Sequence, residues 1–136
     1  MDNRRDFIKK TTLASTGVVV GASAFSAKSY GNIMGANDRV VLGSIGVRGR
    51  GSNLLENFSE MYNDGVHIKT VCDVDSAVLG DNVKTATKNQ KGNKPGTEED
   101  MRRVFEDKEI DAVVVAVPNH WHALATIWAC QAGKHV

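Results

Sequence analysis

Apolar residues follow two different rhythms that alternate along the chain. Residues 40–45 and 112–117 are nearly continuous apolar runs, and residues 66–72 alternate between apolar and polar positions; these patterns predict strands of a buried sheet. Between the runs, apolar residues return every three or four positions, as in residues 54–62, which predicts helices. This alternation implies an α/β fold with a doubly wound parallel sheet, covered by helices on both faces.

Four helices are expected from this pattern. They cover residues 52–62, 76–89, 97–107 and 120–132. Ser52 and Asp75 (or Ser76) are candidate N-cap residues of the first two helices. Thr97 is expected to begin the third helix, because the residues that follow it form an acidic first turn.

The last residues of the sequence predict the start of one more strand. Gly133 is a favourable C-terminal stop for the fourth helix, and His135 and Val136 then resume an extended pattern. We therefore expect the sheet to be incomplete at the C-terminus of this sequence.

A glycine-rich segment, residues 43–51, follows the first predicted strand. A strand that leads through glycines into a helix presents backbone N–H groups at the positive end of the helix dipole, which suits a phosphate group. Dinucleotide-binding loops read Gly-x-Gly-x-x-Gly, and here Arg48 replaces the second glycine. Arg48 or Arg50 either turns outward or contacts the phosphates. The candidate cofactor-binding residues of the loop are Gly46, Arg48, Gly49, Arg50 and Gly51.

Asp73 stands at the end of the second predicted strand, about 20 residues after Gly51, as in dinucleotide-binding proteins. A carboxylate at this point accepts hydrogen bonds from ribose hydroxyls and repels a 2′-phosphate, so NAD is favoured over NADP. The alternative is an aspartate that only forms a turn. Together with the glycine loop, Asp73 predicts that a nicotinamide dinucleotide binds here.

The segment after the strand 112–117 is expected to join this site, because ligands of doubly wound sheets bind at the carboxyl ends of the strands. Pro118 and Asn119 begin the segment, and a His-Trp-His sequence follows at 120–122. The two histidines lack a third ligand, so we expect no metal site. Asn119 or His122 is predicted to lie near the reactive end of the cofactor.

The N-terminal residues 1–24 predict a signal peptide. Two arginines at positions 4 and 5 precede a mildly apolar stretch that is too short for a stable membrane span. Small residues at positions 22–24 then suit a signal peptidase. The pattern resembles the twin-arginine translocation signal, although Asn3 and Ile8 depart from its consensus. Export to the bacterial periplasm through the twin-arginine translocase is expected; the alternative is a basic, frayed helix.

The remaining sequence is expected to form a linker, residues 25–38, and one folded domain, residues 39–136. Cys72 and Cys130 are predicted to be buried free thiols, although an exported chain permits a disulfide.

The composition is 41% hydrophobic and 24% charged, with a net charge of +1, as in soluble globular proteins. Lys and Arg are scattered, so we expect no nucleic-acid partner.

Several short motifs resemble the Gfo/Idh/MocA oxidoreductases, a family that includes glucose–fructose oxidoreductase and inositol dehydrogenase. The residues that carry the resemblance are Cys72–Asp75, Ile110–Val115, Pro118–Ala123 and Ala132–Val136. The resemblance extends over about residues 37–136. It implies that this sequence forms the NAD(P)-binding Rossmann domain of an exported oxidoreductase, and that the enzyme acts on sugars or polyols.

The resemblance also implies roles for single residues. Gly46, Gly49 and Gly51 match the pyrophosphate loop, and Asp73 matches the acid that binds the ribose. Pro118, Asn119 and His122 match the segment that lines the nicotinamide side.

The family's Glu-Lys-Pro motif and its substrate domain have no counterpart in this sequence. We therefore assign no catalytic residue, and we expect a sugar-like substrate only for a full-length form. The alternatives are an NAD-dependent glycoside hydrolase of the same family and a non-catalytic nucleotide-binding remnant.

Overall fold

Four parallel strands form one sheet in the computed structural model, which describes residues 39–136. In sequence order, the strands are β1 (Val40–Ile45), β2 (Val66–Cys72), β3 (Gly96–Glu98) and β4 (Ala112–Val115). Their order across the sheet is β3-β2-β1-β4, and each neighbouring pair is parallel. The predicted signal peptide, residues 1–24, and the predicted linker, residues 25–38, lie outside the described residues.

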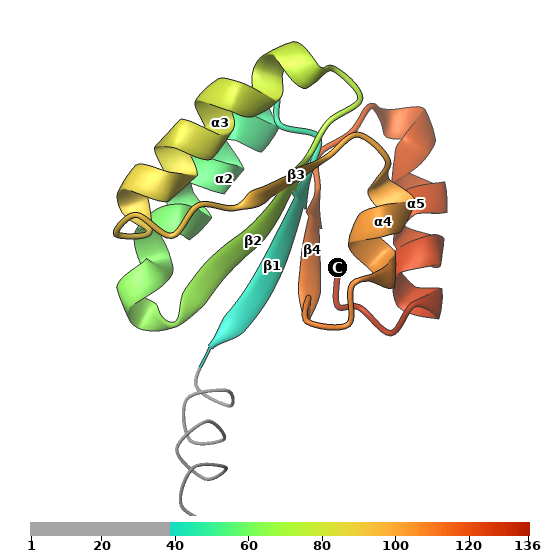
Figure 1. The fold of residues 1–136 in the computed structure, drawn as a ribbon. Coiled ribbons are helices and arrows are strands. Elements are labelled where there is room, and N and C mark those ends of the chain that lie inside the picture. Colours follow the sequence, from blue (N-terminus) through green and yellow to red (C-terminus); the bar gives the residue numbers. More distant parts are fainter. Residues whose placement is uncertain (1–38) are drawn as a thin grey trace, which may run out of the picture. The chain divides into compact units, whose positions relative to one another are not determined.

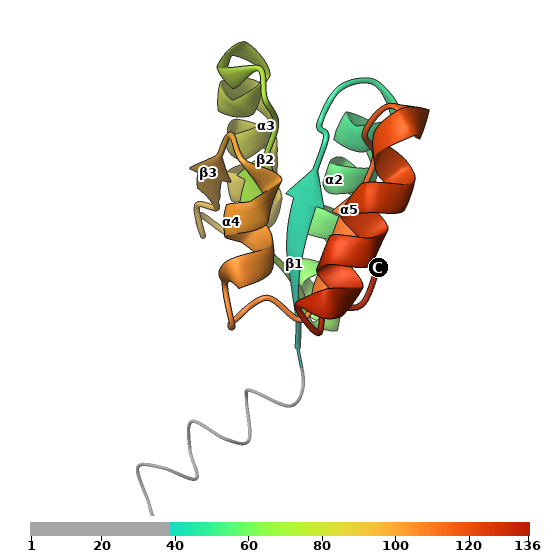
Figure 2. The same ribbon diagram turned by 90° about the vertical axis from the view of Figure 1, so that its right-hand side faces the viewer.

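Helices cover both faces of the sheet (Figures 1 and 2). One face carries α2 (Arg50–Glu60) and α3 (Ser76–Asn89), and the other carries α4 (Met101–Glu106) and α5 (Asn119–Gln131). A turn of 3-10 helix, Met61–Asp64, connects α2 to β2. The predicted α/β fold with a doubly wound parallel sheet is confirmed.

Two clusters of buried apolar side chains join the helices to the sheet. The cluster under α2 and α3 includes Leu42, Leu55, Ile68, Val71 and Val83. The cluster under α4 and α5 includes Val41, Ile45, Val104, Ile110 and Val113. The strand β1 contributes to both clusters, so its successive side chains point into opposite apolar layers. This explains why its apolar run is continuous and does not alternate.

The helix α2 begins earlier than the sequence predicted. Its first residue is Arg50, and Gly49 occupies the N-cap position. Ser52, the predicted cap, lies inside the helix, and its hydroxyl Oγ donates to Oδ1 of Asn82 at 2.8 Å. The helix thus begins at the end of the glycine loop, without a side-chain cap.

The prediction of a helix from Thr97 is wrong. Residues 96–98 form the edge strand β3, in which Thr97 pairs with Val71 of β2. The helix α4 begins only at Met101, after Asp100, whose side chain caps it by accepting from the backbone N–H of Arg102. The acidic residues favour a helix N-terminus locally, but β2 presents an unpaired edge that β3 fills with backbone hydrogen bonds.

The C-terminal residues add a first contact on the far side of β4. His135 forms an isolated parallel bridge with Ala112, and the backbone N–H of Val113 donates to the carbonyl of His135 at 2.8 Å. This agrees with the predicted start of another strand. Gly133, with a φ of +75°, follows α5 at its expected end.

The two cysteines differ in exposure, and both are free. Cys72 is buried in β2, as predicted, whereas Cys130 lies on an exposed position of α5, so its predicted burial is wrong. Burial raises the pKa of the Cys72 thiol to about 12, with a further contribution from nearby carboxylates.

Within residues 39–136, no helix has the length and apolar character that crossing a membrane requires.

Candidate functional site

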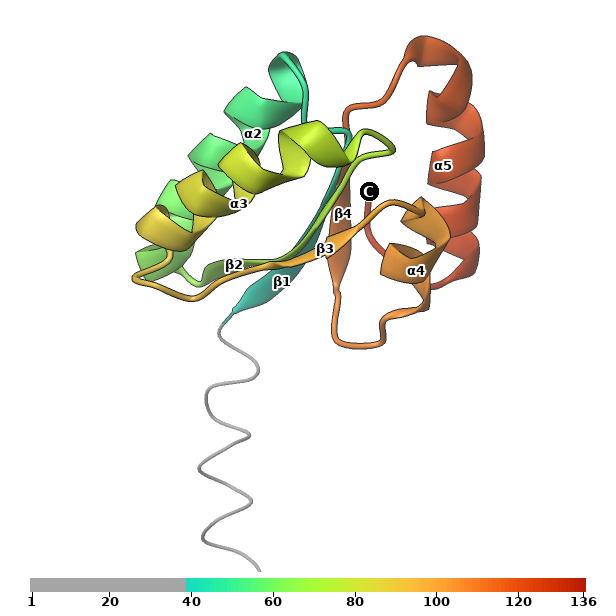
Figure 3. The same cartoon turned by 45° about the horizontal axis from the view of Figure 1, so that its top comes forward.

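The direction in which successive strands are added to the sheet reverses at β1. The strands β2 and β3 lie on one side of β1, and β4 lies on the other. Ligands of doubly wound sheets bind beyond the carboxyl ends of the strands at such a switch point. Figure 3 turns this end of the sheet toward the viewer and shows the chain leaving β1 for α2 and leaving β4 for α5. The two connections meet, since the backbone N–H of Ala116 donates to the carbonyl of Ile45 at 2.8 Å.

Gly46 and Gly51 make the close packing of this connection possible. Gly46 has a φ of +80°, and a Cβ on it would lie 2.7 Å from the carbonyl oxygen of Ala116. A Cβ on Gly51 would collide with the carbonyl oxygen of Gly46. Both positions therefore require glycine, which matches the turn and packing roles of the first and last glycines in a dinucleotide loop.

Gly49 provides the open approach that the motif normally has at its second glycine. Its φ is +48°, and apart from its two chain neighbours no residue has an atom within 4 Å of the place where a Cβ would stand. The side chain of Arg48 forms an ion pair with Asp75. The ion pair places the guanidinium of Arg48 at the junction between the glycine loop and the end of β2, and a phosphate contact of Arg48 or Arg50 remains a prediction.

Backbone N–H groups at the start of α2 remain free for a ligand. Among the residues that the structure describes, none accepts from the N–H of Arg48, Gly49 or Arg50, whereas the N–H of Gly51 donates to the carbonyl of Arg48 at 2.9 Å. Such groups at a helix N-terminus attract anions, because the helix dipole adds to their own polarity. The arrangement suits a pyrophosphate.

Asp73 holds the glycine loop against the end of β2. Its Oδ2 accepts from the backbone N–H of Val47 at 2.9 Å, and its Oδ1 accepts from the backbone N–H of Asp75 at 3.0 Å. A carboxylate has about four acceptor positions, so capacity remains for ribose hydroxyls. The sequence predicted a ligand contact at Asp73, and the structure adds this positioning role.

Asn82 of α3 is a positioning residue that sequence reasoning missed. It is buried, and its Nδ2 donates to the carbonyl of Val47 at 3.0 Å and to that of Val78 at 2.8 Å. Its Oδ1 accepts from Ser52 of α2, so one side chain links the glycine loop to two helices. The available signal was an asparagine on the helix face that also carries Leu79 and Val83.

The segment after β4 is exposed at the same edge of the sheet. Pro118, Asn119 and His122 are all exposed, and Asn119 begins α5. The Nε2 of His122 lies 2.6 Å from the carbonyl oxygen of Val117. Because a carbonyl only accepts, Nε2 is the donor in this contact. Contact of these residues with a nicotinamide remains a prediction.

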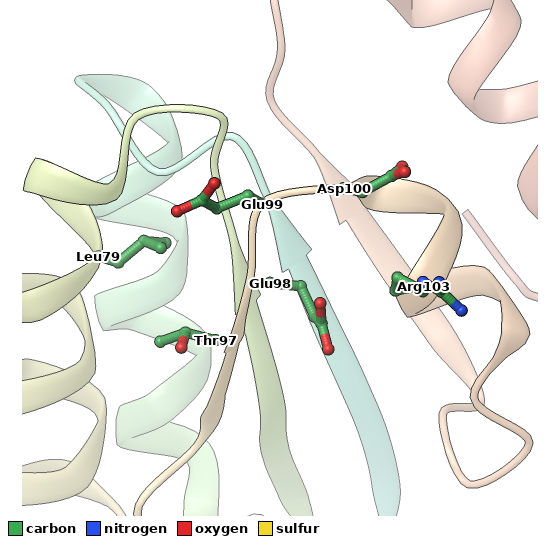
Figure 4. A pocket seen from close by; sticks show the side chains of 6 residues that line it. All are labelled: Leu79, Thr97, Glu98, Glu99, Asp100 and Arg103. Atoms are coloured by element: carbon green, nitrogen blue, oxygen red, sulfur yellow. The ribbon is translucent and has the colours of Figure 1, made fainter.

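A separate hollow of about 380 Å³ lies beside β3. Figure 4 shows Leu79 of α3 on one side of the β3 segment and Arg103 of α4 on the other. The lining includes the carboxylates of Glu98, Glu99 and Asp100, which repel phosphates, so this hollow does not suit a pyrophosphate. Within the described part of the chain, no cluster of three or more metal-ligating side chains occurs.

Comparison with known sequences gives a family match and curated relatives. The sequence model of the Gfo/Idh/MocA family, described as an oxidoreductase family with an NAD-binding Rossmann fold, matches residues 16–136. A glycosyl hydrolase family 109 protein of Shewanella pealeana is 31% identical over 149 residues, covering 98% of this chain and 32% of that protein. This chain therefore spans about one third of the length of the curated relatives it matches.

Two solved structures show the same arrangement of strands and helices. An NAD-binding protein from Listeria innocua is 32% identical, with a TM-score of 0.54, over 73% of this chain and 26% of that chain. The scyllo-inositol dehydrogenase of Lactobacillus casei, solved with NAD(H) and scyllo-inositol, has a TM-score of 0.59. It covers 72% of this chain and 27% of its own at 23% identity, so it supports the fold alone.

Proposed function

This chain belongs to the Gfo/Idh/MocA family of oxidoreductases and carries the family's NAD-binding Rossmann domain, and we propose that it binds NAD in preference to NADP at the switch point of the sheet. The observation that carries this proposal is the start of α2, where N–H groups without an acceptor among residues 39–136 border the open space over Gly49. The carboxylate of Asp73 adjoins this loop through its bond to Val47.

Each part of the site has one task in this proposal. The N–H groups of Gly49 and Arg50 bind the pyrophosphate, and Asp73 accepts from the adenosine ribose, where a 2′-phosphate meets like charge. Pro118, Asn119 and His122 line the nicotinamide side. The bound dinucleotide supplies hydride transfer, whereas the protein's own residues bind and orient it.

For a full-length form, we propose an oxidoreductase that acts on a sugar or polyol. The curated relatives named glycosyl hydrolase family 109 protein support a second candidate, an NAD-dependent glycoside hydrolase. The two differ in net chemistry, and product analysis on the full-length protein separates them. Accumulation of reduced cofactor indicates the oxidoreductase, and a released sugar without net change in the cofactor indicates the hydrolase.

Calorimetric titration of the chain with NAD and NADP tests the binding proposal. We expect saturable binding of NAD and weaker binding of NADP. Gly49→Val is expected to abolish binding, because a branched side chain strains the positive φ and fills the approach to the helix N-terminus. Gly80→Val is a control, because the space at Gly80 on α3 is also open. No saturable binding of either dinucleotide to the unaltered chain would contradict the proposal.

Export through the twin-arginine translocase is a separate proposal, supported only by the sequence of residues 1–24. Replacing Arg4 and Arg5 with lysine keeps the charge but removes the arginine pair. We expect the altered precursor to remain in the cytoplasm in cell fractionation, while the unaltered chain reaches the periplasm. Periplasmic recovery of both would contradict this route.

A further inference from the structure

Arg48 and Asp75 form an ion pair beside the proposed ribose site. The side chains are 64% and 41% exposed, so solvent surrounds the pair on one side. Asp75 also fixes the start of α3, because its Oδ1 accepts from the backbone N–H of Ala77 at 3.0 Å. Its two carboxylate oxygens therefore have different partners, a helix N-terminus and a guanidinium.

A continuous set of contacts connects this pair to Asp73. The backbone N–H of Asp75 donates to Oδ1 of Asp73, and the other oxygen of Asp73 accepts from Val47, the residue before Arg48. The guanidinium of Arg48 thus lies across the junction between the glycine loop and the end of β2. The inference about cofactor choice that follows rests on the proposed function, in which this junction receives the adenosine ribose.

The remaining charges near this junction are mainly negative. The negative charges of Asp73, Glu98 and Asp100 all help to raise the pKa of the Cys72 thiol at the end of β2. Two other arginines nearby are already paired, Arg102 with Asp100 and Arg103 with Glu106. Among the described residues, Arg48 is the arginine that the contacts join to the ribose acid, through Asp75.

An arginine beside the ribose acid is the group that accommodates a 2′-phosphate in dinucleotide-binding folds. Here Asp75 neutralises that arginine and orients it toward the N-terminus of α3. We propose that the Arg48–Asp75 ion pair determines the cofactor preference of this chain, because Asp75 withholds the guanidinium from the 2′-phosphate of NADP. Asp75 is then a specificity residue that acts through Arg48.

A double-mutant cycle tests this role. The dissociation constants of NAD and NADP are measured for the unaltered chain, Asp75→Asn, Arg48→Met and the double variant. Asparagine is as good an N-cap as aspartate, so Asp75→Asn preserves the start of α3. We expect Asp75→Asn to tighten NADP binding about tenfold relative to NAD, the scale of one charge-assisted contact at an exposed site. In the Arg48→Met background, the same replacement is expected to give no such gain.

Asp81→Asn is the matched control, because it removes one exposed carboxylate from the same helix, where Asp81 pairs with Lys84. We expect this control to leave the ratio of the two dissociation constants unchanged. An equal gain from Asp75→Asn with and without Arg48 would overturn the inference, because removal of charge alone would then explain it. An unchanged ratio in Asp75→Asn would also overturn it, while leaving the proposed function intact. Failure of the unaltered chain to bind either dinucleotide would overturn both.

Discussion

Asp73 accepts a hydrogen bond from the backbone N–H of Val47 at 2.9 Å, and this contact joins the ends of two neighbouring strands. The residue that marks the ribose side of the site thus also shapes the loop that marks its phosphate side. Ligand affinity and loop order are therefore coupled through one carboxylate. Replacements at Asp73 have to be chosen so that the two effects can be separated.

Asp73→Asn separates them, because an amide oxygen can still accept from one backbone N–H whereas the negative charge is lost. We expect Asp73→Asn to weaken NAD binding more than NADP binding, since the repulsion of a 2′-phosphate disappears. Compared with Asp73→Asn, Asp73→Ala is expected to lower the free energy of unfolding by a further amount of roughly 1–3 kcal/mol, because the N–H of Val47 loses its acceptor. Titration and urea denaturation measure the two effects, and an equal loss of NAD and NADP affinity in Asp73→Asn would contradict the ribose role.

Asn82 offers a test of loop positioning without direct ligand contact. Asn82→Ala removes the donor to the carbonyl of Val47 and leaves the hydroxyl of Ser52 without its acceptor. We expect a loss of about 1–3 kcal/mol in the free energy of unfolding, together with weaker binding of NAD and NADP by the same factor. Asn53→Ala, at an exposed position of α2, is the control. Discrimination between the two cofactors by Asn82→Ala would argue against a purely positioning role.

The sequence predicts those elements whose signal is local. The apolar runs of β1, β2 and β4 and the helical spacing in α2 are properties of consecutive residues, and their elements formed where expected, apart from shifted ends. The strand β3 has no such signal, because its three residues are all exposed and none packs into a core. Its conformation is set by pairing with β2, which the residues around Thr97 do not reveal.

The candidate site divides in the same way. Gly46 and Gly51 are recognisable because the close contacts that exclude a side chain recur at fixed spacing in dinucleotide loops. Outside the site, the structural role of Lys134 is not recognisable from the sequence, although Lys134 is buried and its Nζ donates to the carbonyls of Asp107 and Ile110 at 2.6 and 2.8 Å. Its acceptors are backbone atoms distant in the sequence, and a backbone acceptor places no constraint on residue type.

His67 predicts a pH dependence of stability. Burial lowers the pKa of His67 below its usual 6.5, and the positive charges of Arg39 and Lys69 add to the shift. The unfolded chain therefore binds a proton more readily, so this contribution is fully present above pH 6.5 and is lost as the pH falls through the lower folded value. We expect the unfolding free energy to fall between pH 7.5 and 5.5 by more in the unaltered chain than in His67→Gln. Urea denaturation at both values measures this, with exposed His120→Gln as the control, and equal losses in all three chains would contradict the role of His67.

The two cysteines predict a labelling pattern that reports on the integrity of the sheet. Cys130 is exposed on α5, whereas Cys72 is buried and its pKa of about 12 keeps the thiol protonated at pH 8. Because the thiolate is the reactive form, a disulfide reagent is expected to modify one thiol per native chain rapidly and the second only after denaturation. Cys130→Ser is expected to remove the rapid phase and leave the slow one. A rapid phase that persists in Cys130→Ser would show that the carboxyl end of β2 is open to solvent, in conflict with the packing of Cys72 against α4 and α5.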